Sequence, residues 1–108
     1  MNDIIIGKGN LVRKGVFADR NFKKGEIVIK YNLKPLTKER HDSLPEDQKL
    51  FTHIHWDQIY LYGVPERYVN HSSEPNTHPD LQNKCDIAIR DIEKDEMITT
   101  NATMDDVY

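Results

Sequence analysis

The sequence predicts a single, mainly β domain with short helices. Two observations carry this prediction. The apolar runs are short, rich in Ile and Val and separated by turns, which is typical of strands, and one strand–turn–strand pattern occurs twice. With 108 residues, the chain is long enough for one modest core and too short for an additional cofactor domain. We therefore expect residues 1–108 to form one domain, with any active site built inside it.

The first third of the chain is expected to contribute three strands. Ile4 to Ile6 form a β-branched run that ends in a glycine-rich turn, as strands commonly do. A second strand follows at Gly15–Ala18, and a third, which alternates between apolar and polar side chains, at Glu26–Tyr31. Because proline cannot donate a backbone hydrogen bond, Pro35 is expected to end this strand.

The middle of the chain predicts short helices followed by aromatic strands. Between the third strand and residue 52 the sequence is polar and charged, with widely spaced leucines. This pattern favours one or two short helices, near Thr37–His41 and Glu46–Phe51. The stretch His53–Tyr62 is aromatic and β-branched, which predicts a strand or a hairpin that ends at Gly63.

A repeat covers much of the remaining sequence. Residues Phe17–Val28 align without gaps with Ile87–Ile98, and both read as a strand, an arginine, a polar turn, an apolar anchor, a lysine-containing turn and a second strand. The second copy overlaps the last expected strands, Asp86–Arg90 and Glu96–Thr100. The pair predicts two hairpin-like halves packed around one core. Chance similarity is the alternative, because turn chemistry repeats readily.

The polar segment Arg67–Asn76 is the candidate functional site. Asn70 carries hydrogen-bond donors and acceptors, His71 can present either tautomer, and two serines follow. Pro75 prevents the segment from continuing as a helix. An ordinary surface turn has a similar composition, so the assignment depends on what lies beside the segment.

Composition narrows the classes of function. The net charge is −3, so the chain lacks the electrostatic footprint of general nucleic-acid binding, whereas a lysine-rich peptide is a compatible partner. The single cysteine, Cys85, cannot form an intramolecular disulfide, and the N-terminal stretch is too short and too charged for a signal peptide. These features suggest an intracellular protein, cytoplasmic or, if the source is eukaryotic or viral, nuclear. No apolar run approaches the length of a membrane span.

Several segments in this order resemble the SET domain of protein-lysine methyltransferases. The resemblance is specific at Asn70-His71-Ser72 and Pro75-Asn76, and thin between Leu33 and Asp57. It implies a minimal family member with a β-clip-like fold of small, curved sheets, in which the C-terminal segment threads beneath a preceding loop. The other matching segments are Gly15–Ala18, Lys24–Glu26, Arg67–Tyr68, Ile89–Ile92 and Glu96–Thr99.

The resemblance also implies S-adenosylmethionine as the cofactor and a lysine-containing protein or peptide as the substrate. The cofactor would lie against the glycine-containing segment, where Gly15 lacks a Cβ and permits close approach. Asn70 and His71 would hold it from the other side, while Tyr68 alternatively fills the core. The cofactor-binding residues implied in this way are Arg13, Lys14, Gly15, Arg67, Tyr68, Asn70 and His71.

Methyl transfer to lysine requires a neutral amine, held in line inside a channel that excludes water. Tyr60 and Tyr62 would line this channel, or alternatively pack beside Trp56. The family signature carries a catalytic tyrosine where this chain has Ala102, whose side chain has no hydroxyl. Tyr108 would supply a hydroxyl if the tail folds back into the site.

Three alternatives remain open. The alanine at position 102 favours an inactive SET-like module that binds cofactor or peptide. His53-Ile54-His55 places two imidazoles on one strand face, which suggests a cupin-like metal site, although no third ligand follows at short spacing. The repeated turn pattern also resembles β-clip interaction modules that bind ice or sugar acids, a likeness that is confined to the two repeats.

Overall fold

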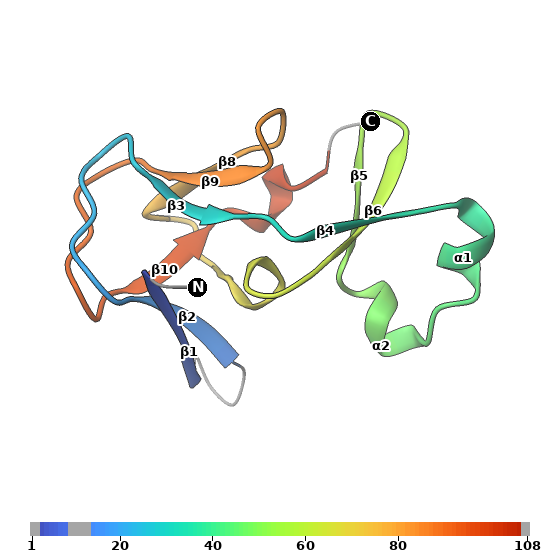
Figure 1. Cartoon of the computed structure of the whole chain (residues 1–108), viewed down its shortest axis with the longest axis horizontal. Helices are drawn as coiled ribbons and strands as arrows, with labels where there is room; N and C mark the ends of the chain where they lie inside the picture. Colours follow the sequence, from blue (N-terminus) through green and yellow to red (C-terminus); the bar gives the residue numbers. More distant parts are fainter. Residues whose placement is uncertain (1–2, 9–13, 107–108) are drawn as a thin grey trace.

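The computed structural model describes residues 3–8 and 14–106, which form three small sheets (Figure 1). The predicted mainly β fold with short helices is confirmed. The first sheet has the order β1 (Ile4–Lys8), β2 (Lys14–Ala18), β10 (Met97–Thr100) and β7 (Asn70–His71). The second has the order β3 (Ile27–Lys30), β9 (Cys85–Ala88) and β8 (Thr77–Asp80), and the third β4 (Leu33–Leu36), β6 (Gln58–Tyr62) and β5 (Thr52–His55).

The helices are short and lie between the strands. The α-helices α1 (Lys38–Asp42) and α2 (Glu46–Lys49) connect β4 to β5, close to the predicted positions. The 3-10 helix η1 (Glu66–Tyr68) precedes β7, and η2 (Ala102–Met104) follows β10. Within the described residues, no helix has the length and apolar character needed to cross a membrane.

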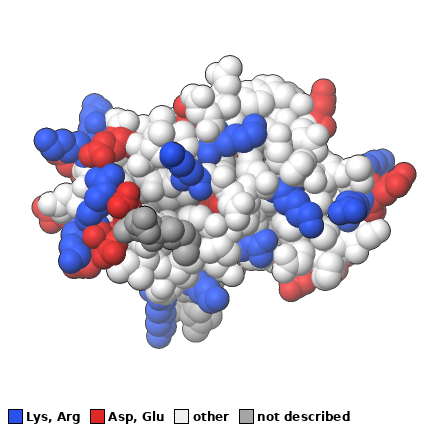
Figure 2. Space-filling model, in the orientation of Figure 1, with Lys and Arg blue, Asp and Glu red and all other residues white. Residues whose placement is uncertain are grey.

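The two repeats form the centre of the fold and exchange strands. β2 from the first copy pairs with β10 from the second, and β3 pairs with β9 in the same antiparallel manner. The apolar anchors Phe22 and Ile92 exchange two backbone hydrogen bonds of 2.8 Å. Each copy also contains an Arg–Glu ion pair at its turn, and Figure 2 shows acidic and basic side chains interspersed at this end of the molecule. The predicted arrangement of two halves around one core is therefore confirmed.

Equivalent positions of the two copies supply most of the hydrophobic core. The buried positions Ala18, Phe22 and Val28 of the first copy correspond to Ala88, Ile92 and Ile98 of the second. Burial of their apolar surface is the main stabilising contribution. The partly buried Tyr68 and Val69 pack against this core, so the beginning of the candidate functional segment is anchored on the repeat centre.

Two strands that contain proline are not predicted by the sequence. β4 runs through Pro35, opposite Tyr60, and β8 runs through Pro79, opposite Asp86. Both are edge strands of three-stranded sheets. An edge strand has no neighbour on one side, so a proline there, which lacks an N–H, removes no hydrogen bond between strands. The expectation that Pro35 ends a strand is wrong for this reason.

β10 passes beneath the segment that follows β7. It lies between β2 and β7 in the sheet and runs parallel to β7. The side chain of Asn76, which is 1% exposed, accepts from the Thr99 amide at 2.8 Å and donates to the Met97 carbonyl at 2.8 Å. On the other side of the loop, the Ser72 amide donates to the Thr100 carbonyl at 2.9 Å. The threaded C-terminal segment implied by the resemblance is confirmed.

Gly63 lies at the end of β6, where the backbone of Asn32 leaves no room for a side chain. A Cβ at Gly63 would lie 2.3 Å from the Asn32 carbonyl oxygen. Gly63→Ala is therefore expected to lower the unfolding free energy by about 2 kcal/mol or more, measured by thermal or urea denaturation. Gly7→Ala is the matched control, because its Cβ would meet only the Phe17 ring, at 3.3 Å. Equal losses of stability in the two variants would contradict this account.

Candidate functional site

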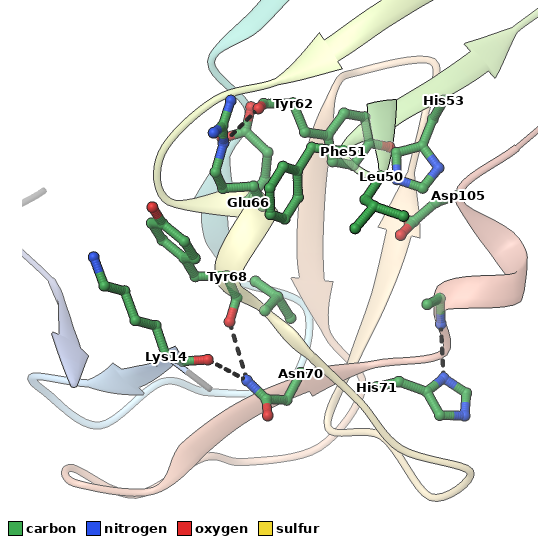
Figure 3. Close-up of a pocket in the computed structure, with 13 residues that line it drawn as sticks. Lys14, Leu50, Phe51, His53, Tyr62, Glu66, Tyr68, Asn70, His71 and Asp105 are labelled. Atoms are coloured by element: carbon green, nitrogen blue, oxygen red, sulfur yellow. Dashed lines mark hydrogen bonds between the residues drawn. The ribbon is translucent and has the colours of Figure 1, made fainter. Parts of the chain in front are cut away.

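A cleft of about 740 Å³ lies where the first and third sheets approach the two 3-10 helices (Figure 3). Its lining comes from β2, β5, β6, η1, β7 and η2, together with the turn between α2 and β5. The strand exchange of the repeats brings β2 next to β10, whose other neighbour in the sheet is β7. Segments that are far apart in the sequence therefore meet around one cavity of a size typical for small-molecule sites.

Asn70 joins two walls of this cleft. Its Nδ2 donates to the carbonyl oxygen of Lys14 at 2.9 Å and to that of Tyr68 at 3.1 Å. Lys14 is the first residue of β2, and Asn70 the first of β7. The Asn70 side chain therefore links the start of β7 to the start of β2, as the dashed line to Lys14 in Figure 3 shows.

His71 connects the polar segment to η2. Its Nδ1 accepts a hydrogen bond of 3.0 Å from the amide of Ala102, which leaves the proton of a neutral imidazole on Nε2. The Asn101 side chain caps η2 by accepting from the Thr103 amide at 3.2 Å. Ala102 stands where the resemblance implies a tyrosine, and it lines the cleft with a methyl group.

Aromatic side chains form one side of the cleft. The rings of Phe51 and Tyr68 meet edge to face with their centroids 6.5 Å apart. The Arg67 guanidinium lies 4.7 Å from the Phe51 centroid, and its Nε donates to the Tyr62 carbonyl at 2.8 Å. The Lys14 ammonium lies 5.0 Å from the Tyr68 centroid. Aromatic faces of this kind stack well on nucleobases and attract cations.

The hydroxyl of Tyr62 belongs to a buried hydrogen-bonded group. It lies 3.0 Å from Nε2 of His55, which also lies 3.1 Å from the Asp105 carbonyl oxygen. Burial lowers the pKa of His55, so this imidazole is neutral at pH 7. Burial raises the pKa of Tyr62, and the nearby charges of Asp105 and Asp86 raise it further. Tyr62 is therefore a neutral hydrogen-bonding group on the cleft wall.

Three carboxyl groups in this region are almost fully buried. Asp86 is 2% exposed, Glu66 5% and Asp105 7%. Burial raises the pKa of Asp86 to about 7, although the hydrogen bond from the Tyr31 hydroxyl acts in the opposite direction. Burial also raises the pKa of Asp105 to about 7, with a further contribution from the charge of Asp86. Both groups therefore titrate near neutral pH, unlike ordinary aspartates.

Sequence reasoning does not identify these three carboxyl groups. Asp86 opens a predicted strand, and Asp105 stands in an Asp-Asp pair that has the composition of an exposed tail. Glu66 lies just before the candidate segment in a charged stretch. Carboxylates are rarely buried without a partner, so no local pattern signals that the fold encloses all three.

Most of the predicted cofactor-binding residues lie at the cleft. Its lining includes Lys14, Arg67, Tyr68, Asn70 and His71. Gly15 is the neighbour of Lys14 in β2, where it pairs with Gly7 of β1, and it does not line the cleft. The predicted Arg13 lies outside the described residues.

The predicted catalytic tyrosines are distributed differently. Tyr62 lines the cleft, whereas Tyr60 does not, although both belong to β6. The Tyr60 ring instead contacts the Lys84 ammonium, at 5.2 Å from its centroid, and the ring of His55. Tyr108 lies outside the described residues.

The imidazoles considered as metal ligands are bonded within the protein. His53 Nδ1 lies 3.3 Å from a carboxylate oxygen of Asp106, and His55 Nε2 contacts Tyr62 and Asp105 as described above. Among the described residues, no group of three or more His, Cys, Asp or Glu side chains could hold a metal ion. The metal alternative gains no support from this part of the chain.

Comparison with known proteins relates this chain to one family. The family model described as the SET domain matches residues 13–101. The N-lysine methyltransferase KMT5A-B of Xenopus laevis is 34% identical over 96 residues, which cover 75% of this chain and 27% of that protein. The chain therefore spans about a quarter of the length of this relative.

Two solved structures share the fold. One is a Plasmodium falciparum protein assigned provisionally as a histone methyltransferase, with a TM-score of 0.74 and 24% identity, covering 92% of this chain and 91% of that chain. The other is a chain of an active polycomb repressive complex 2 in the basal state, with a TM-score of 0.72 and 24% identity over 91% of this chain and 15% of that chain.

Proposed function

Because the chain belongs to the SET domain family, we propose that it transfers a methyl group from S-adenosylmethionine to a lysine side chain of a protein or peptide. The observation that carries the proposal is the cleft at which Lys14, Asn70 and His71 meet Tyr62. The name of the Xenopus laevis relative, an N-lysine methyltransferase, supports the same reaction class.

The residues at the cleft fit this cofactor in size and chemistry. The volume of about 740 Å³ lies within the range of about 300–1,000 Å³ that is common for such ligands. Tyr68 and Phe51 offer aromatic faces to a nucleobase or to a sulfonium cation. Lys14, Arg67, Tyr68, Asn70 and His71 line the cleft and would hold the cofactor, with Gly15 and Arg13 as the neighbours of Lys14 on the chain.

The residues of the chain would bind and orient the lysine amine. When bound, the cofactor supplies a methyl group on a positively charged sulfur. The apolar side chains of Phe51 and Val69 line the cleft and would exclude water, which disfavours the ammonium form of a lysine. Tyr62 offers a neutral hydroxyl for orientation of the amine nitrogen. Tyr60 does not line the cleft, so it would not contact the amine directly.

The expected partner is a lysine-containing protein or peptide, whose positive charge suits the net charge of −3. Two of the similar proteins described above carry histone or lysine methyltransferase in their names, so a histone tail is the natural first substrate to assay. A nuclear or cytoplasmic location would provide access to such substrates.

Titration calorimetry with S-adenosylmethionine and S-adenosylhomocysteine tests the cofactor. Saturable binding is expected, and Asn70→Ala should weaken it at least tenfold, or about 1.4 kcal/mol, because the two bonds that join Lys14 to Tyr68 are lost. Asn83→Ala is the matched control, since Asn83 is exposed, does not line the cleft and bonds to Asp80 in its own turn. Absence of saturable binding at about 1 mM cofactor, a binding free energy near −4 kcal/mol, would refute the proposal.

A second candidate function is favoured by Ala102. A SET domain without the tyrosine hydroxyl at this cleft position could bind cofactor and peptide without turnover. Transfer of a labelled methyl group to a lysine-rich peptide separates the two functions. Cofactor binding without any transfer would identify the inactive module, and transfer would identify the enzyme.

A further inference from the structure

Glu66, Asp86 and Asp105 surround Tyr62 with buried carboxyl groups, and their charges contribute to its raised pKa. None of the ion pairs within residues 3–8 and 14–106 includes any of the three. A buried charge is costly unless it is paired. A positively charged ligand would therefore bind best at whichever of these three carboxyl groups has no protein partner.

Two of the three carboxyl groups are bonded to protein donors. Glu66 Oε2 accepts from the amides of Asn32 at 2.7 Å and Gly63 at 2.9 Å. Asp86 accepts from the Tyr31 hydroxyl. These bonds tie the connection between β3 and β4 to β9 and to η1, and η1 to the residue after β6, so the first role of both groups is structural. The second oxygen of Glu66, Oε1, is a buried atom without a hydrogen-bond partner among the described residues.

Asp105 differs from the other two. It is 7% exposed, yet its carboxylate accepts no hydrogen bond from the described part of the chain. It lines the cleft, and Figure 3 shows its carboxylate directed into it. Its oxygens are not among the fully enclosed side-chain atoms that lack a partner, so they are accessible from the cleft. Its position points to a ligand that brings N–H donors or a positive charge.

Asp105 also lies one helical turn from the position that lacks a hydroxyl. Its amide donates to the Ala102 carbonyl at 3.3 Å as the C-cap of η2. η2 is held in place by the bond from the Ala102 amide to His71, and by the contact of His55 Nε2 with the Asp105 carbonyl oxygen, at 3.1 Å. The same short helix thus brings an alanine and a carboxylate to the cleft.

We propose that the carboxylate of Asp105 binds the substrate amine in this cleft and accepts its proton, a role that rests on the function proposed above. In this step an N–H bond of the ammonium breaks, its electron pair stays on nitrogen, and the proton bonds to a carboxylate oxygen of Asp105. The neutral amine then has the lone pair that methyl transfer requires. The proton passes from Asp105 to solvent through the open side of the cleft.

The environment of Asp105 suits proton acceptance. Its pKa of about 7 makes the carboxylate a stronger base than an ordinary aspartate, whose pKa is about 3.9, while much of it remains ionised at pH 7 to 8. The groups around it are Asp86, Asp106 and Tyr62. A bound ammonium would relieve the repulsion among these carboxylates, which favours binding of the charged form first.

Titration with n-butylammonium, a mimic of the lysine side chain, tests the amine site without cofactor. The two-dimensional NMR signals of the Ala102–Asp105 amides are expected to shift with saturation. Asp105→Asn should weaken the affinity at least tenfold, since a hydrogen bond to a charged group contributes about 1.5–3 kcal/mol. Asp19→Asn, an equal change of charge at an exposed position, should leave the affinity unchanged. Neutral 1-butanol should bind both proteins equally weakly.

Three results would overturn the assignment. The first is that Asp105→Asn and the unaltered protein bind n-butylammonium with equal affinity. The second is that the shifted NMR signals belong to residues outside η2 and the cleft. The third is that binding does not saturate at about 100 mM amine, which corresponds to a binding free energy near −1.4 kcal/mol. Unfolding curves accompany the titration. Asp105→Asn removes an unpaired buried charge, so it should keep or raise the unfolding temperature, and a loss of binding would then reflect the carboxylate itself.

Failure of this inference and failure of the proposed function give different results. If Asp105→Asn methylates a lysine-rich peptide at the unaltered rate, the methyltransferase assignment stands and the amine assignment falls. If S-adenosylmethionine does not bind but n-butylammonium binds through Asp105, the cleft is an amine site and the methyltransferase assignment falls.

Discussion

Asp86→Asn is expected to stabilise the protein by about 2–4 kcal/mol at pH 8 and by almost nothing at pH 4. Each pKa unit between the folded and unfolded chain corresponds to about 1.4 kcal/mol, and the pKa of Asp86 rises from 3.8 to about 7 on folding. A group with a raised pKa contributes stability that is fully present below the unfolded pKa and is lost as the pH rises through the folded pKa. The unaltered protein should therefore lose stability between pH 4 and 8.

Asparagine keeps the shape of Asp86 and can still accept the hydrogen bond from Tyr31, so the variant removes the titration of Asp86 and the contribution of its charge to the raised pKa of Asp105. Its urea unfolding free energy should vary less between pH 5 and 8 than that of the unaltered protein. Asp19→Asn, exposed at a repeat turn, is the control and should follow the unaltered curve. A lower stability of Asp86→Asn at pH 8 would show that the ionised carboxylate is needed by the fold.

Ala102→Tyr is expected to restore methyl transfer in the Asp105→Asn variant by at least tenfold, within the range of about 10²–10⁴ that positioned proton-transfer groups contribute. Ala102 lines the cleft and is exposed, so a larger side chain has room there. The tyrosine would return the hydroxyl that the SET signature carries, and that hydroxyl would orient the amine in place of the lost carboxylate. The measurement is labelled methyl transfer to a lysine-rich peptide.

Ala102→Phe in the same background is the matched control, because it adds the same ring without a hydroxyl. It should restore nothing. If the two double variants behave alike, the hydroxyl is irrelevant and Ala102 does not stand in the place of the family tyrosine. If Ala102→Tyr restores cofactor affinity rather than the transfer rate, the position belongs to the cofactor side of the cleft.

The repeat explains why so much of the fold is predictable. Short-range patterns identify β2, β3, β9 and β10, because each combines an apolar strand with a turn that has a distinctive sequence. The strand exchange between the copies then follows from the need to bury both apolar faces in one core. The anchors Phe22 and Ile92, equivalent in the alignment and paired in the fold, illustrate this directly.

The strands that are not predicted depend on their position in a sheet. Pro35 and Pro79 are compatible with β4 and β8 only because both strands lie at edges, and edge position is a property of the assembled sheet. β7, with two residues, exists because β10 supplies its partner. No local pattern of residues 70 and 71 distinguishes such a strand from a turn.

Some residues of the candidate site are predictable from the sequence and others are not. The resemblance identifies Asn70 and His71 and the segment around Gly15, and the structure brings Asn70 against Lys14 through a hydrogen bond of 2.9 Å. It does not identify Asp86 or Asp105. Both lie near Tyr62, whose pKa their charges raise, although the three residues come from segments that are far apart in the sequence.

By itself the sequence determined the class of fold, the repeat and the family, because these depend on residue types at short spacing. Only the tertiary structure decided which side chains share the cleft and how they titrate. The pKa of a carboxyl group depends on the solvent and charges that surround it, and these are supplied by distant segments. Asp105 illustrates this, because its local sequence is typical of an exposed tail and yet the fold buries it at the wall of the cleft.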